Sequence, residues 1–141
     1  MAIKNVFEHT NSLKSTIENL SVDDLQGEME SGSELLLIDL REIQEVVDLG
    51  TIPGAHNVAR GMLEFWADPA SPYYRDYFAE DKRIVTFCAG GGRSVYATLA
   101  LGEMGYTNVA HLEVGFNGWE KSGGEVEDVS ATSKWIRRAK V

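Results

Sequence analysis

Cysteine is nearly absent from this sequence: one residue in 141, so no disulfide can form within the chain. No apolar run approaches the roughly 20 residues of a membrane-spanning helix, and the first ten residues lack the apolar segment of a secretory signal. These absences favour a cytoplasmic protein that makes no membrane contact. Basic residues are also scarce, since 13 Lys and Arg face 22 Asp and Glu and give a formal charge of −9. This balance argues against nucleic-acid binding, which needs clustered Lys and Arg.

Histidine is also scarce, with three residues in the chain. His9 lies in a weakly patterned N-terminus, His56 follows a Pro-Gly turn, and His111 falls in an expected strand. The last two are interpreted as structural, and a Cys–His dyad stays an open alternative. One thiol with scattered histidines has no metal-ligand spacing, so neither metal nor cofactor is expected. The sequence therefore presents no obvious base for its cysteine.

The length predicts one domain with a core of its own. Residues 21–124 are expected to form it, preceded by an extension, residues 1–20, that packs as an extra helix. Residues 125–141 are expected to be an acidic and then basic tail. Its basic cluster is interpreted as a solvated surface; the residues are Lys134, Arg137, Arg138 and Lys140.

Short apolar runs alternate with helical segments between residues 21 and 124. This alternation predicts an α/β fold with a central, mostly parallel sheet of about five short strands and helices on both faces. Strands are expected at 35–39, 83–87 and 109–112, and another ending at 58. Helices are expected at 21–31, 41–49, 61–66, 73–78, 93–104 and after 115.

The chain's one cysteine, Cys88, directly follows the expected strand 83–87 and begins a glycine-rich turn into a helix. Ligands of open α/β sheets bind at such strand ends. The glycines let backbone amides turn toward the sulfur, and a helix N-terminus with an arginine nearby favours the thiolate. The last serine of the turn can cap the helix or hydrogen-bond the sulfur. The candidate binding residues are Ala89, Gly90, Gly91, Gly92, Arg93 and Ser94, with Cys88 as the catalytic nucleophile.

Three stretches of the chain resemble motifs of the rhodanese family of sulfurtransferases. The family's loop of a cysteine, four residues and an arginine is matched by Cys88 to Arg93. Its opening motif resembles Ile-Asp-Leu-Arg-Glu at 38–42 with Ile-Pro-Gly-Ala-His-Asn at 52–57, and its closing Gly…Trp motif resembles 114–119. The resemblance implies the three-layer rhodanese fold, with Asp39 and Arg41 as scaffold.

The resemblance also implies a chemistry. Cys88 would accept a sulfane sulfur and become a persulfide, which the amides of residues 89–94 would hold. Arg93 would shape the loop and attract a small anionic donor such as thiosulfate. The sulfur would then pass to cyanide, a small thiol or a protein thiol, including a thioredoxin-like one. Because the chain has no second thiol, its sulfur must leave to a separate acceptor.

Other functions stay open at this point. The chain could be a protein-to-protein sulfur carrier, or a regulatory binding module on the same scaffold. A phosphatase or arsenate reductase is disfavoured, because such enzymes resemble a cysteine, five residues and an arginine, whereas four residues intervene here. The aromatic segment 60–78 is interpreted as a pocket wall, a dimer contact or a packed excursion. The oligomeric state is left open between monomer and homodimer.

Overall fold

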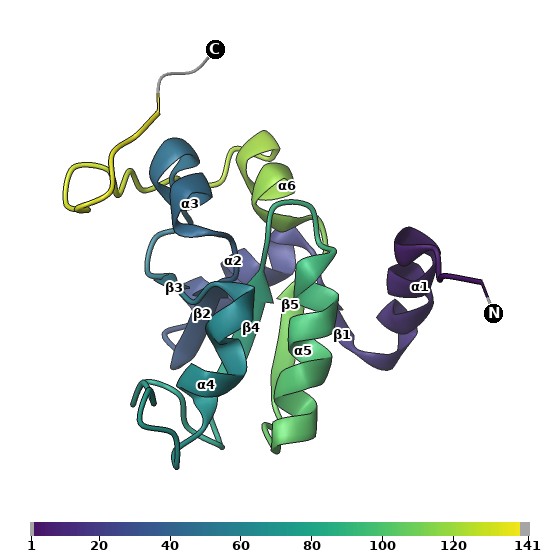
Figure 1. Cartoon of the computed structure of the whole chain (residues 1–141). Helices are drawn as coiled ribbons and strands as arrows, with labels where there is room; N and C mark the ends of the chain where they lie inside the picture. The colour runs from purple at the N-terminus through teal and green to yellow at the C-terminus, as the bar shows by residue number, and fades with distance from the viewer. Residues whose placement is uncertain (1, 139–141) are drawn as a thin grey trace.

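A computed structural model describes residues 2–138 of the chain; Met1 and residues 139–141, with Lys140 of the basic cluster, lie outside the described residues. Five strands form one sheet in the order β1-β5-β4-β2-β3, and all its strand pairings are parallel (Figure 1). The strands are β1 (Glu18–Leu20), β2 (Leu35–Asp39), β3 (His56–Asn57), β4 (Arg83–Phe87) and β5 (Val109–Leu112).

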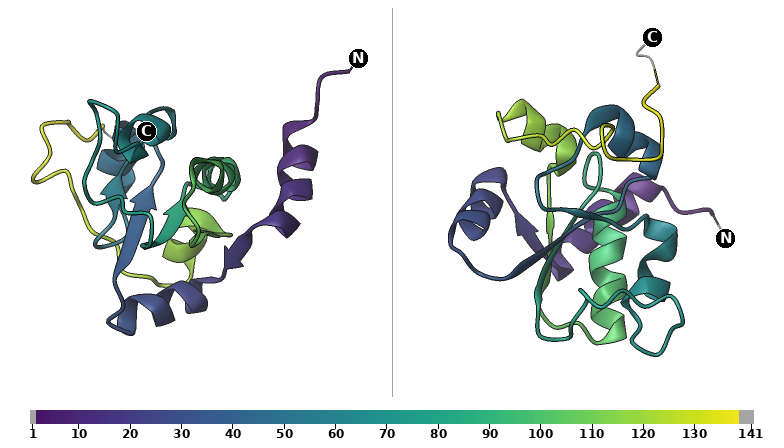
Figure 2. Two further views of the ribbon diagram at one scale, coloured as in Figure 1. Left: turned by 90° about the horizontal axis from the view of Figure 1, so that it is seen from below. Right: turned by 90° about the vertical axis from the view of Figure 1, so that its left-hand side faces the viewer.

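Helices cover both faces of the sheet, which confirms the three-layer α/β prediction (Figure 2). One face packs against α4 (Leu63–Ala67) and α5 (Arg93–Met104), and the other against α2 (Val22–Glu30) and α6 (Gly115–Lys121). The remaining helices are α1 (Val6–Leu13), α3 (Ile43–Leu49) and the 3₁₀ turns η1 (Lys14–Thr16) and η2 (Arg60–Met62).

The central strands are buried on both faces, as their continuous apolar runs indicate. In β4, Ile84 packs with the α4 and α5 side, while Val85 and Phe87 pack with the α2 and α6 side. Alternate side chains of a strand point to opposite faces, so one short run fills both layers of the core. No helix within residues 2–138 is long and apolar enough to cross a membrane.

Two local predictions are wrong. Residues 18–20 form strand β1, where an extra helix was expected to continue, because their backbone pairs in parallel with β5. A three-residue strand is too short to show a period in the sequence. Residues 73–78 form consecutive turns and no helix. There Phe78 is buried in the core, and the hydroxyl of Tyr74 donates to its carbonyl.

A buried ion pair fixes the end of β2, as expected for Asp39 and Arg41. The Arg41 guanidinium donates to both carboxylate oxygens, at 3.0 and 2.8 Å, and to the Gly50 carbonyl at 2.7 Å. Thr51 donates a further hydrogen bond to Asp39 at 2.8 Å. The guanidinium also lies over the ring of Phe116 in α6, 4.2 Å from its centroid. This pair therefore ties β2 to the helix that follows β5.

Candidate functional site

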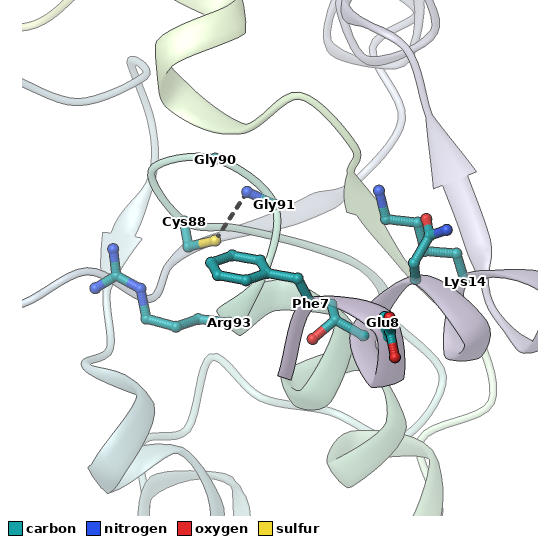
Figure 3. Close-up of a pocket in the computed structure, with 10 residues that line it drawn as sticks. Phe7, Glu8, Lys14, Cys88, Gly90, Gly91 and Arg93 are labelled. Carbon is teal, nitrogen blue, oxygen red and sulfur yellow. Dashed lines mark hydrogen bonds between the residues drawn. The ribbon is translucent and has the colours of Figure 1, made fainter. Parts of the chain in front are cut away.

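Strand β4 runs into a loop that leads to α5 (Figure 1). Cys88 is the first residue of this loop, at the carboxyl end of β4. Cys88 is 1% exposed, and its sulfur contacts two polar groups of the same loop. The Gly91 amide donates to Sγ at 3.2 Å (Figure 3), and the Ser94 hydroxyl oxygen lies 3.7 Å from Sγ. Ser94 thus contacts the sulfur and does not cap α5, whose N-cap residue is Gly92. Within the described chain, Gly91 supplies the one amide that hydrogen-bonds the free thiol.

The loop is held from behind by the start of α6. The Phe116 amide donates to the Cys88 carbonyl at 2.8 Å, and the Asn117 amide donates to the Ala89 carbonyl at 3.0 Å. This approach requires glycine at the first helical position, because Gly115 has φ +65° and a Cβ there would collide with both carbonyls. The closing Gly…Trp stretch therefore has a direct structural role behind the cysteine loop.

Gly91 is the one glycine of the loop whose conformation requires glycine. Its φ is +99°, and a Cβ would collide with the carbonyl oxygen of Glu113. The Gly91→Ala variant is therefore expected to lose about 1–3 kcal/mol of stability, the usual range for backbone strain of this kind. Gly90→Ala is the matched control, since nothing lies within 4 Å of its Cβ position and its φ is not positive. Urea unfolding measures both variants, and equal midpoints would contradict this account.

Arg93, the first residue of α5, lies at the edge of the site in an ion pair. Its guanidinium donates to both carboxylate oxygens of Glu45 in α3, at 2.9 and 3.0 Å. The hydrogen bonds from Arg93 hold the pKa of Glu45 below its ordinary value, and Glu45 in turn raises the pKa of Arg93. Arg93 is thus fixed between α3 and the loop. Its partner could not be identified from the spacing of the motif alone.

An open cavity of about 720 Å³ lies in front of Cys88 (Figure 3). One wall is the loop itself, with Gly90, Gly91, Gly92 and Arg93. Helix α1 supplies the opposite wall, which the sequence reasoning missed. Its most prominent member is Phe7, 83% exposed although it is a large apolar side chain. The α1 side of the cavity, including the turn after it, comprises Phe7, Glu8, Thr10, Asn11 and Lys14.

One histidine reaches the neighbours of Cys88. His111 in β5 is buried, and its Nδ1 lies 2.8 Å from the Ser94 hydroxyl. Burial lowers the pKa of His111 to about 4, so the ring is neutral near pH 7. By contrast, His56 stacks on Tyr77 and His9 lies beside Tyr96. No group of three metal-ligating residues occurs within residues 2–138.

The rhodanese-like domain profile matches residues 21–122. The chain belongs to the rhodanese-like domain family. Among its relatives is YtwF of Bacillus subtilis, a sulfurtransferase by name, which is 33% identical over 104 residues; the match covers 74% of this chain and 91% of YtwF. Membership of the rhodanese-like family supports sulfurtransferase-type activity.

Two further similar proteins carry other descriptions. The tRNA uridine(34) hydroxylase of Xylella fastidiosa is 37% identical over 101 residues, which are 70% of this chain and 38% of that enzyme. The chain thus spans well under half of those hydroxylases. A solved structure from Rhodopseudomonas palustris, of unknown function and described as a possible tyrosine phosphatase, is 40% identical with a TM-score of 0.83. That match covers 90% of this chain and 97% of the other, and so includes residues outside 21–122.

Proposed function

We propose that this protein is a sulfurtransferase that carries a sulfane sulfur from thiosulfate, or a related anionic donor, on Cys88 and passes it to a nucleophilic acceptor. One observation carries this proposal. Cys88 stands at the carboxyl end of a parallel strand, in a four-residue loop whose Gly91 amide already contacts its sulfur at 3.2 Å. Cys88 and its loop line the 720 Å³ cavity, which has room for a small anionic donor.

The proposed transfer has two balanced steps. The Cys88 thiolate attacks the outer sulfur of thiosulfate, a new S–S bond forms, and sulfite leaves with the electrons of the old S–S bond. A thiolate or cyanide then attacks the outer sulfur of the Cys88 persulfide, and the Cys88 thiolate leaves. The two steps return the enzyme to its starting state. Because Cys88 is the one cysteine of the chain, the sulfur goes to a separate molecule.

The loop favours sulfur transfer over phosphate chemistry. Four residues between Cys88 and Arg93 make a small ring, suited to a sulfur about 2 Å beyond Sγ. A tetrahedral phosphate bound over Cys88 needs a wider ring of amides than these four residues make. The R. palustris relative described as a possible phosphatase is the reason to test both reactions.

Mass spectrometry of the intact protein after incubation with thiosulfate tests the proposal. We expect a mass increase of one sulfur atom on Cys88, removed by cyanide or by a small thiol. The same preparation is assayed with an aryl phosphate. An unmodified Cys88 with every sulfane donor tried would refute the proposal, and turnover of the phosphate would favour the alternative.

Helix α1 is proposed to help bind the acceptor, since residues 1–20 place Phe7 opposite Cys88. The Phe7→Ala variant is expected to raise the KM for a thiol acceptor roughly 3- to 10-fold, the loss of one partly desolvated aromatic contact. Persulfide formation from thiosulfate should be unchanged. Phe65→Ala is the matched control, because Phe65 is also exposed, at 56%, and lies in α4 away from the cavity. Equal KM values for both variants would exclude this role for α1.

A further inference from the structure

A chain of hydrogen bonds lies behind Cys88 and links three elements of the fold. The Cys88 sulfur is 3.7 Å from the Ser94 hydroxyl in α5, and that hydroxyl is 2.8 Å from Nδ1 of His111 in β5. Nε2 of His111 is 2.7 Å from Oδ1 of Asn19 in β1. Ser94 and His111 are fully buried. The strand missing from the sequence prediction thus reaches the cysteine through two side chains.

The direction of each hydrogen bond follows from Asn19. Its Nδ2 donates to the Lys14 carbonyl at 2.8 Å and to the Ile17 carbonyl at 3.1 Å, so its Oδ1 faces His111 as an acceptor. Nε2 of His111 must therefore carry the hydrogen. Since burial keeps the ring neutral, Nδ1 carries none and accepts from the Ser94 hydroxyl.

This arrangement leaves the Ser94 oxygen with only lone pairs to present to the sulfur. The oxygen can accept a hydrogen bond from the Cys88 thiol, but it cannot donate one to the thiolate. A lone pair aimed at an anionic sulfur is unfavourable. In a persulfide the negative charge moves to the outer sulfur, about 2 Å from Sγ. The inner sulfur then carries little charge.

We propose that Asn19 and His111 are positioning residues that turn the Ser94 hydroxyl away from the sulfur and so disfavour the empty Cys88 thiolate relative to the thiol and the persulfide. The benefit of this arrangement rests on the proposed function, because only sulfur transfer uses the persulfide. The orientation itself is independent of any substrate. Gly91 opposes Ser94, since its amide stabilises negative charge on the same atom.

The charged residues near the hydrogen-bond chain are the same in every variant. Lys14 from η1 and Glu113 after β5 face His111, and they form a pair with 3.9 Å between Nζ and Oε1. Arg93 with its partner Glu45 and the cavity residues Lys14 and Glu8 face Cys88. His111→Phe leaves the hydrogen bond from Asn19 to the Lys14 carbonyl in place, so this variant reports most directly on the hydrogen-bond chain.

The rate of Cys88 alkylation by iodoacetamide, followed against pH, tests the proposal without any sulfur donor. It reports on one thiol, because the chain has one cysteine. His111→Phe frees the Ser94 hydroxyl to donate to the sulfur, and its alkylation midpoint should fall by about one pH unit, a tenfold higher rate at a fixed lower pH. Asn19→Leu removes the oxygen that accepts from Nε2 of His111, and it should move the midpoint in the same direction.

Ser94→Ala supplies the decisive comparison. In a Ser94→Ala background, His111→Phe should no longer move the midpoint, because no hydroxyl remains to reorient. A midpoint that rises in Ser94→Ala, or a His111→Phe effect that persists without Ser94, would overturn the proposal. So would an unmoved midpoint in both His111→Phe and Asn19→Leu, with folding checked by circular dichroism. Failure of all proteins to form a persulfide would refute the proposed function and leave the alkylation result standing.

Discussion

Replacing Cys88 by serine is expected to lower sulfur transfer from thiosulfate to cyanide by roughly 10⁴- to 10⁶-fold, as for other enzymes that lose their nucleophile. A serine hydroxyl is not ionised near neutral pH and cannot form the S–S bond of the intermediate. No second cysteine can replace Cys88. Thiocyanate production gives the rate, and intact mass gives the sulfur adduct, which should be absent from the Cys88→Ser variant.

The Cys88→Ser variant is also its own folding control. Serine is close to cysteine in size, so the buried site should keep its packing and the unfolding midpoint should stay near that of the parent protein. A variant that folds normally and retains a tenth or more of the parent rate would show that sulfur transfer does not pass through Cys88.

Asp39→Asn is expected to lower the free energy of unfolding by about 3–5 kcal/mol, the usual cost of leaving one buried charge without its partner. Arg41 is completely buried and loses a carboxylate that accepts from its Nε and Nη2 atoms. The damage should extend to the cysteine loop, because Arg41 lies on Phe116 and the Phe116 amide holds the Cys88 carbonyl. Urea unfolding measures the loss.

A surface ion pair provides the control for Asp39→Asn. Arg60 and Glu64 lie 2.7 Å apart, with side chains 31% and 45% exposed, so Glu64→Gln should change stability by no more than about 1 kcal/mol. The double variant Asp39→Leu with Arg41→Met removes both charges and should recover much of the loss. If Asp39→Asn costs no more than Glu64→Gln, the burial of this pair has little energetic weight.

Much of the fold could be predicted because its signals are local. The apolar runs that became β2, β4 and β5, and the glycine turn before α5, lie in continuous sequence. The position of Cys88 at a strand end followed from the same runs. Family motifs then predicted the three-layer arrangement, which the helices packed on both faces of the sheet confirm. The division of the chain into residues 1–20, 21–124 and 125–141 stays a prediction.

The remaining features depend on contacts between distant residues. Strand β1 forms because its backbone pairs with β5, more than 80 residues away along the chain by the register of Asn19 with His111. The cavity wall depends on where η1 directs α1, and the partner of Arg93 lies 48 residues earlier in the chain. His111 was interpreted as structural, and it lies buried in β5 with a hydrogen-bond partner at each ring nitrogen. The link from His111 to Cys88 through Ser94 depends on how β5 and α5 pack together, which no pattern in the sequence predicts.

Helix α6 holds the cysteine loop through hydrogen bonds to two of its carbonyls, and this determines which loop positions can change in sequence. A trans peptide points its carbonyl and its amide hydrogen in opposite directions. Hydrogen bonds that draw the Cys88 and Ala89 carbonyls back toward α6 therefore turn the following amides away from it. The main chain of the loop is thus fixed by α6, while open space at Gly90 and Gly92 leaves room for new side chains. Side chains at these two positions can therefore change while the backbone of the cysteine loop keeps its shape.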